Sequence, residues 1–262
     1  MRGLCLWLGV IGALCCASAA SAYEQVHLYA TFSPDRLNTS TTVAFGLAVS
    51  SPDGTTPSPL EDLQLFLPAG LGLATSTLGL ANCDPSLLLE KGISGCSVNA
   101  RMGYGTAEAV VPISPEQVIE KATITALAGP PNPEHLELLF YAEAISPVAA
   151  QLVFPGRMEI GAPKGLYSGD LDTTVPLVPT WPGGPDVSLT RLRSTIGPAG
   201  LTYTRRLHGR TIRFHPQGIT IPSSCPRGGF RLEGIFTFLD GSSVRTKTTI
   251  PCPRTQRRSA RG

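Results

Sequence analysis

Apolar and polar side chains alternate in short runs along most of this chain. In residues 25–32, Val26, Leu28, Ala30 and Phe32 occupy every second position. A period of two is typical of a β-strand with one buried face, and β-branched and aromatic residues favour the same structure. Comparable runs predict further strands at 41–49, 63–67, 103–112, 122–128, 136–144, 148–154, 187–196, 201–207, 211–214, 219–221, 230–239 and 242–250.

Turn-forming residues separate these runs. The chain contains 28 Gly and 24 Pro among 262 residues, yet 42% of it is hydrophobic, which argues against disorder. About a dozen short strands without helical periods between them predict an all-β protein. We expect an antiparallel β-sandwich, immunoglobulin-like or two-lobed, over 23–253. The Pro-rich stretch 161–186 is expected to be a loop or surface crossover.

Residues 1–22 have the pattern of a signal peptide. Arg2 is followed by an apolar run to Ala20, and Ala20-Ser21-Ala22 is a small-x-small cleavage site. Cleavage after Ala22 would make Tyr23 the first residue of a secreted or extracellular protein. A retained membrane anchor is the alternative, but the run is short and contains two glycines. The sequence therefore predicts no stable transmembrane anchor.

Four cysteines follow the predicted cleavage site: Cys83, Cys96, Cys225 and Cys252. An even number in an exported chain indicates disulfides, and four cysteines allow three pairings. Local pairing is favoured, because Cys225 and Cys252 bracket a predicted hairpin that turns at Asp240-Gly241. The other pair flanks a short predicted helix. A zinc site is the alternative, but neither pair has the CxxC spacing typical of zinc ligands.

The predicted helix lies between Cys83 and Cys96. Asp84 suits the N-cap, Pro85 suits the first helical turn, and Gly92 suits the C-terminal end. A disulfide between the two cysteines would staple this helix. It is the one helix expected in the domain.

Charge is distributed unevenly between the two halves. Residues 23–186 contain 17 acids and 6 bases, whereas residues 187–262 contain 2 acids and 14 bases. The change of charge near Asp186 is a candidate boundary between two lobes. The tail 254–262 is predicted to be a basic, disordered end.

A cluster of arginines suits phosphate and carboxylate ligands. The candidate anion-binding residues are Arg191, Arg193, Arg205, Arg206, Arg210 and Arg213. The alternatives are that the two halves neutralise each other, or that these arginines are solvated strand faces.

The sequence contains little that predicts catalysis. No Gly-x-Ser-x-Gly nucleophile motif occurs, and His27, His135, His208 and His215 are scattered. Asp170 and Asp172, with Asp186, form only a weak candidate for a Ca²⁺ site. We therefore expect no catalytic, metal or cofactor site. A hydrolase whose carboxylates come from distant strands is the alternative.

One segment resembles a pattern in uncharacterised exported β-sheet proteins of high-GC Gram-positive bacteria, the actinobacteria. Leu67-Pro68-Ala69-Gly70-Leu71 is followed by Cys83 and by the stretch 96–107, CSVNARMGYGTA. In that family the second cysteine is followed by Pro and later by Ser, where this chain has Ser97 and Ala100. The later Cys225-Pro-Arg-Gly segment only approximates the family pattern. The resemblance implies an exported β-sheet protein and transfers no catalytic residue.

These observations predict a non-catalytic protein of the cell envelope or extracellular space. Its expected partner is an anionic cell-wall polymer or lipid headgroups, bound through the arginines, with no nucleic acid. A secreted hydrolase acting on polysaccharide or ester is the alternative function.

Overall fold

The structure of this protein, a computed structural model, describes residues 23–113, 116–147 and 149–253. Its strands are β1 (Gln25–Ser33), β2 (Thr39–Ser50), β3 (Leu60–Pro68), β4 (Gly72–Leu73), β5 (Arg101–Ile113), β6 (Glu116–Ala128), β7 (Leu136–Ala144), β8 (Ala150–Lys164), β9 (Tyr167–Thr174), β10 (Ser188–Ile196), β11 (Tyr203–Leu207), β12 (Arg210–Phe214), β13 (Ile219–Ile221), β14 (Phe230–Phe238) and β15 (Ser243–Ile250). One α-helix, α1 (Pro85–Lys91), and two short 3₁₀ turns, η1 (Gly92–Gly95) and η2 (Val98–Ala100), lie between β4 and β5. The predicted all-β class with one short helix is confirmed.

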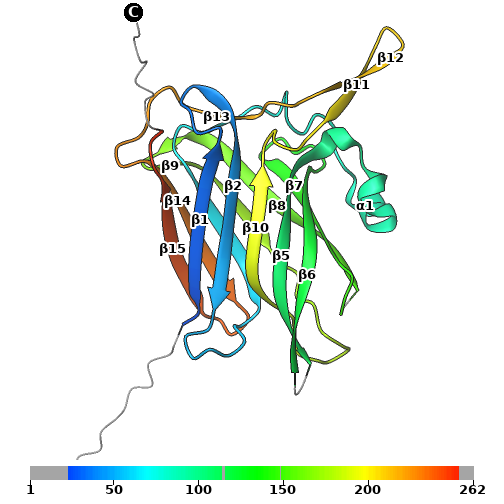
Figure 1. Cartoon of the computed structure of the whole chain (residues 1–262), viewed down its shortest axis with the longest axis vertical. Coiled ribbons are helices and arrows are strands. Elements are labelled where there is room, and N and C mark those ends of the chain that lie inside the picture. Colours follow the sequence, from blue (N-terminus) through cyan, green and yellow to red (C-terminus); the bar gives the residue numbers. More distant parts are fainter. Residues whose placement is uncertain (1–22, 114–115, 148, 254–262) are drawn as a thin grey trace, which may run out of the picture.

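Thirteen strands form a single antiparallel sheet. Its order is β15-β14-β3-β9-β8-β7-β6-β5-β10-β2-β13-β4, and β1 pairs with β2 beside this path. The sheet folds over on itself, so that β1 comes to lie beside β15 and the strands around β2 face those around β9 (Figure 1). The two layers of the predicted sandwich thus come from one continuous sheet. Strands from both sides of Asp186 belong to it, since β10 pairs with β2 and β5.

The alternating pattern accounts for the buried face of these strands. In β1 every second residue is buried, beginning with Val26, and β14 buries the alternate positions from Phe230 to Phe238. The inward rings of Phe32 and Phe230 pack edge to face, with centroids 5.2 Å apart. Burial of such side chains contributes about 1.5–3 kcal/mol each and drives the closure of the fold.

Two segments differ from the sequence-based expectation. β8 continues through Pro155 and Gly156, where the strand was expected to end, and β9 lies in the stretch expected to be a loop. The carbonyl of Pro155 accepts a hydrogen bond of 2.7 Å from the Thr173 hydroxyl of β9. In β9 the inward positions include Ser168 and Thr173, so its apolar alternation is weak in the sequence.

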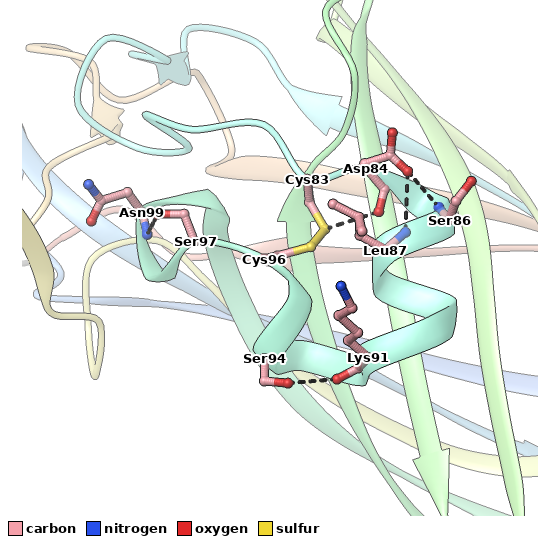
Figure 2. The surroundings of a disulfide bond; sticks show 9 residues. All are labelled: Cys83, Asp84, Ser86, Leu87, Lys91, Ser94, Cys96, Ser97 and Asn99. Carbon is pink, nitrogen blue, oxygen red and sulfur yellow. Dashed lines mark hydrogen bonds between the residues drawn. A yellow bond between two sulfur atoms is a disulfide. The ribbon is translucent and has the colours of Figure 1, made fainter.

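The predicted disulfide joins the two ends of the segment that contains helix α1. Cys83 and Cys96 are bonded, and the Asp84 carboxylate caps the helix by accepting from the amides of Ser86 and Leu87 (Figure 2). Leu88 is fully buried in a second small core that includes Leu127, Leu139 and Tyr141. The Cys225–Cys252 disulfide is also present and joins the two ends of the β14–β15 hairpin. Both predicted pairings are confirmed.

A separate hairpin of β11 and β12 projects away from the folded sheet (Figure 1). The predicted signal peptide, its cleavage site after Ala22 and the basic tail 254–262 lie outside the described residues. Across the described ranges, which begin at residue 23, we find no helix whose length and apolar character would let it cross a lipid bilayer.

Candidate functional site: an apolar cavity and an arginine hairpin

The folded sheet encloses an apolar cavity of about 100 Å³. Strands from both layers contribute to its lining, including Ala30 and Phe32 from β1, Phe45 from β2 and Phe140 from β7. β4 and β13 add Leu73 and Ile219, so the cavity lies toward the end of the molecule where these two short strands pair. The opposite end of the interior is filled by fully buried side chains such as Leu47, Phe236 and Phe238.

The lining has one polar side chain. Ser168 is buried, and its hydroxyl donates a hydrogen bond of 3.0 Å to the carbonyl of Pro68, so its hydrogen-bonding capacity is used within the protein. All other lining residues are Ala, Val, Leu, Ile, Met, Phe, Pro or Gly. An interior of this kind excludes water and accepts apolar groups, because a buried water requires several polar partners.

The cavity reaches solvent on the side of β8. Ile160 belongs to the lining and is still 45% exposed. Several other lining side chains, among them Phe45, Leu71 and Ile196, are only partly buried although they point into the interior. Unfilled apolar surface inside a fold loses packing contacts, so occupation of this space by an apolar molecule would be favourable.

The structure divides the six candidate anion-binding arginines between two elements. Arg191 and Arg193 lie on the outer face of β10 and are exposed. Arg191 forms an ion pair of 3.2 Å with Glu108 on the neighbouring strand β5. This part of the positive charge is therefore partly neutralised by the acidic half of the chain, as one of the alternatives supposed.

The other four arginines lie on the β11–β12 hairpin and are exposed. From the pairing register, Arg205 and Arg210 share one face of the hairpin, and Arg206 and Arg213 share the other. The Arg205 guanidinium carbon lies 5.5 Å from the centroid of the Phe214 ring, a cation–π contact. The six arginines therefore do not form one continuous face.

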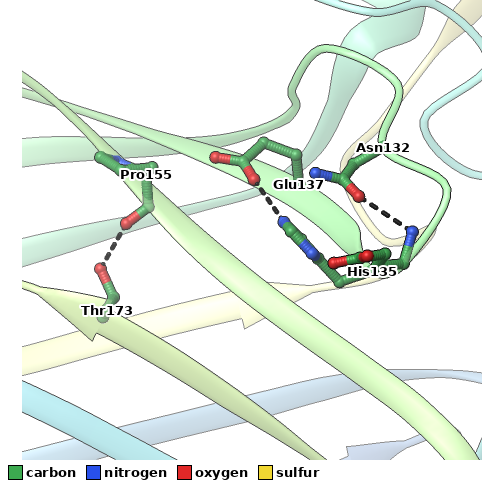
Figure 3. Close-up of polar contacts among 6 residues, drawn as sticks. Asn132, His135, Glu137, Pro155 and Thr173 are labelled. Carbon is green, nitrogen blue, oxygen red and sulfur yellow. Dashed lines mark hydrogen bonds and ion pairs between the residues drawn. The ribbon is translucent and has the colours of Figure 1, made fainter.

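A second, more polar pocket of about 340 Å³ lies beside α1. Half of its lining residues are prolines, and Glu137 supplies a carboxylate and Asn132 an amide. His135 Nε2 lies 2.8 Å from Glu137 Oε2, and the Asn132 side chain accepts a hydrogen bond from the Glu134 amide (Figure 3). A glycosidase requires two carboxylates across the scissile bond, and this lining contains one.

A compact polar cluster occupies the outer face of β9, β14 and β15. The Tyr167 hydroxyl donates to Glu233, which also pairs with Arg245 at 3.2 Å, and the Tyr167 ring lies against Phe66. Burial, followed by the hydrogen bond and charge of Glu233, raises the pKa of Tyr167 to about 12. A neutral phenol bonded to a carboxylate stabilises this part of the sheet.

No group of three or more His, Cys, Asp or Glu side chains that could hold a metal ion occurs among the residues that the structure describes. Asp170 and Asp172 lie on β9, which is paired on both edges.

The sequence did not predict the apolar cavity. The one feature of the sequence that could have indicated the cavity is the presence of small residues at inward positions, such as Ala30 and Ala126, which leave space between larger side chains.

In comparisons with known proteins, the chain matches no family model, no curated protein and no solved structure.

The two disulfides are crosslinks of the kind that persist in an oxidising compartment.

Proposed function

We propose that this chain is an exported, non-catalytic binding protein that holds a small apolar ligand, or the end of a lipid chain, inside its folded sheet. The observation that carries the proposal is the cavity of about 100 Å³ whose lining has Ser168 as its one polar side chain. Apolar cavities of comparable size, about 150 Å³, stay dry and bind benzene or xenon. Export is supported by the signal-peptide pattern of residues 1–22 and by the two disulfides.

A hydrocarbon chain suits this cavity better than a polar ligand does. Ser168 already donates to Pro68, so the lining has little to offer a sugar or a charged group, and burying such groups without partners is unfavourable. The exposed edge at Ile160 leaves a route by which a chain end enters while its polar head stays in water.

Titration with 1-alkanols from butanol to decanol, followed by calorimetry, tests the proposal. Each added methylene should tighten binding about fourfold until the cavity is filled, since each buried CH₂ contributes about 0.8 kcal/mol. Ala30→Leu, which fills the cavity, should abolish binding. Thr31→Leu on the same strand points to the outer face and should leave binding unchanged. Absence of binding across the series, or equal binding by Ala30→Leu, would contradict the proposal.

A further inference from the structure

The β11–β12 hairpin combines a fixed base with an unpartnered outer half. At its base, Tyr203 is fully buried, and its hydroxyl accepts from the Gly79 amide at 3.0 Å and donates to the Arg101 carbonyl. The Asn99 side chain forms two hydrogen bonds to the backbone of Thr204. From Arg205 to Thr211 every residue is exposed. The hairpin is thus held in a defined direction while both faces of its outer half meet solvent (Figure 1).

The tip of the hairpin exposes one leucine, and its flanks are basic. His208 and Gly209 both have positive φ, 48° and 77°, and form the two-residue turn that a tight hairpin requires. Leu207 precedes this turn and is 47% exposed. Arg205 and Arg210 share its face of the hairpin, Arg206 and Arg213 lie on the opposite face, and residues 187–232 contain no acidic residue. An exposed leucine at the end of a projecting element that carries guanidinium groups on both faces fits an anionic lipid surface.

We propose that the β11–β12 hairpin docks onto an anionic phospholipid bilayer, with Leu207 entering the headgroup region and the arginines binding phosphates. Guanidinium groups bind phosphate through two parallel hydrogen bonds, and arginines near an anionic membrane surface each strengthen binding about fivefold. A soluble polyanion would use the same arginines but would gain nothing from Leu207. The exposed leucine at the tip is therefore the feature that favours a bilayer over a polymer.

The docking surface and the apolar cavity lie toward the same end of the molecule. β12 ends at Phe214 and β13 begins at Ile219, whose side chain lines the cavity. Figure 1 shows the hairpin projecting from the end at which β13 lies. Docking would bring the cavity close to the source of an apolar chain, although the hairpin's charge and tip support docking without reference to the cavity.

Vesicle sedimentation with the purified protein tests the inference. We expect binding to vesicles of phosphatidylcholine mixed with phosphatidylglycerol, weakening with salt, and no binding to phosphatidylcholine alone. Arg206→Ala/Arg210→Ala should lower the affinity about 25-fold. Arg191→Ala/Arg193→Ala removes the same charge from the face of β10 and should have a much smaller effect.

Leu207→Ser distinguishes the bilayer from an anionic polymer. This variant should bind vesicles about tenfold more weakly while binding long-chain polyphosphate as the unchanged protein does. Equal loss on both partners, or no loss on vesicles, would overturn membrane docking in favour of polymer binding. Failure to bind mixed vesicles at low salt would also overturn it. Ala30→Leu should leave vesicle binding unchanged, so failure of the cavity proposal and failure of this one are distinguishable.

Discussion

Asn99 and Thr204, 105 residues apart in the sequence, are joined by a pair of hydrogen bonds. The Asn99 side-chain NH₂ donates to the Thr204 carbonyl at 2.7 Å, and the Thr204 amide donates to Asn99 Oδ1 at 2.9 Å. Within the residues that the structure describes, β11 pairs with no strand other than β12, and this side chain takes the place of a second partner strand for one of its residues. It connects the 3₁₀ turn η2, and through it the disulfide-linked helix segment, to the base of the projecting hairpin.

We predict that Asn99→Ala loosens the hairpin without unfolding the sheet. Two neutral hydrogen bonds contribute about 1 kcal/mol each, so the free energy of unfolding should fall by about 2 kcal/mol or less. The Thr204 amide should lose its protection in hydrogen exchange, while amides of β14 keep theirs. Asn132→Ala removes one hydrogen bond in an exposed loop and serves as the control, with a change below about 0.5 kcal/mol. Unchanged protection at Thr204 would show that the pair does not hold the hairpin.

The local part of the fold could be predicted from the sequence. β1 and β14 place apolar residues at every second position, and the cap at Asp84 depends on neighbouring residues alone, so short-range patterns were sufficient. β9 was missed because its buried positions include Ser168 and Thr173, whose burial depends on hydrogen bonds to other strands. That information is absent from the segment itself.

The candidate site was harder to predict for the same reason. The lining residues of the cavity become neighbours only through strand pairing, and no spacing within one segment reveals them. The arginines were singled out from the sequence as one charged set, but Arg205 and Arg206 are consecutive in a strand and therefore point to opposite faces. The period of two that predicted the strands also implied that these arginines are divided between two faces.

We predict that the two disulfides contribute unequally to stability. From the lengths of the closed loops, which span 13 and 27 residues, each should contribute about 3 to 4 kcal/mol, slightly more for the longer one. Cys83, however, is 1% exposed within the small core under α1, whereas Cys252 is exposed. Cys83→Ser/Cys96→Ser should therefore be more destabilising in urea than Cys225→Ser/Cys252→Ser. The reverse order would indicate that loop length outweighs burial.

Gly46 marks a close approach on the outer face of β2. A Cβ atom there would overlap the Leu192 carbonyl oxygen of β10 and the Tyr29 ring of β1. Because the backbone oxygen cannot move aside, Gly46→Ala should destabilise the protein by about 1–3 kcal/mol. Gly161 on β8 has no atom within 4 Å of the corresponding position, so Gly161→Ala is the matched control and should change stability little. Thermal unfolding of both variants tests the contrast, and equal effects would rule out the overlap as the cause.

The Tyr167–Glu233 pair predicts a loss of stability at high pH. The pKa of Tyr167 is raised from 10.0 to about 12, chiefly by burial and then by Glu233. Because the folded state favours the neutral phenol, its contribution is complete below pH 10 and is lost as the pH rises towards 12. Tyr141 and Tyr203 also have raised pKa values, through burial, so the unchanged protein contains more than one such group.

The Tyr167→Phe variant should be less stable than the unchanged protein at neutral pH and should lose less stability between pH 10 and 12. Urea unfolding of both proteins across this range, with phenolate absorbance recorded in parallel, measures the difference. An identical pH dependence in the two proteins would show that Tyr167 does not couple ionisation to folding.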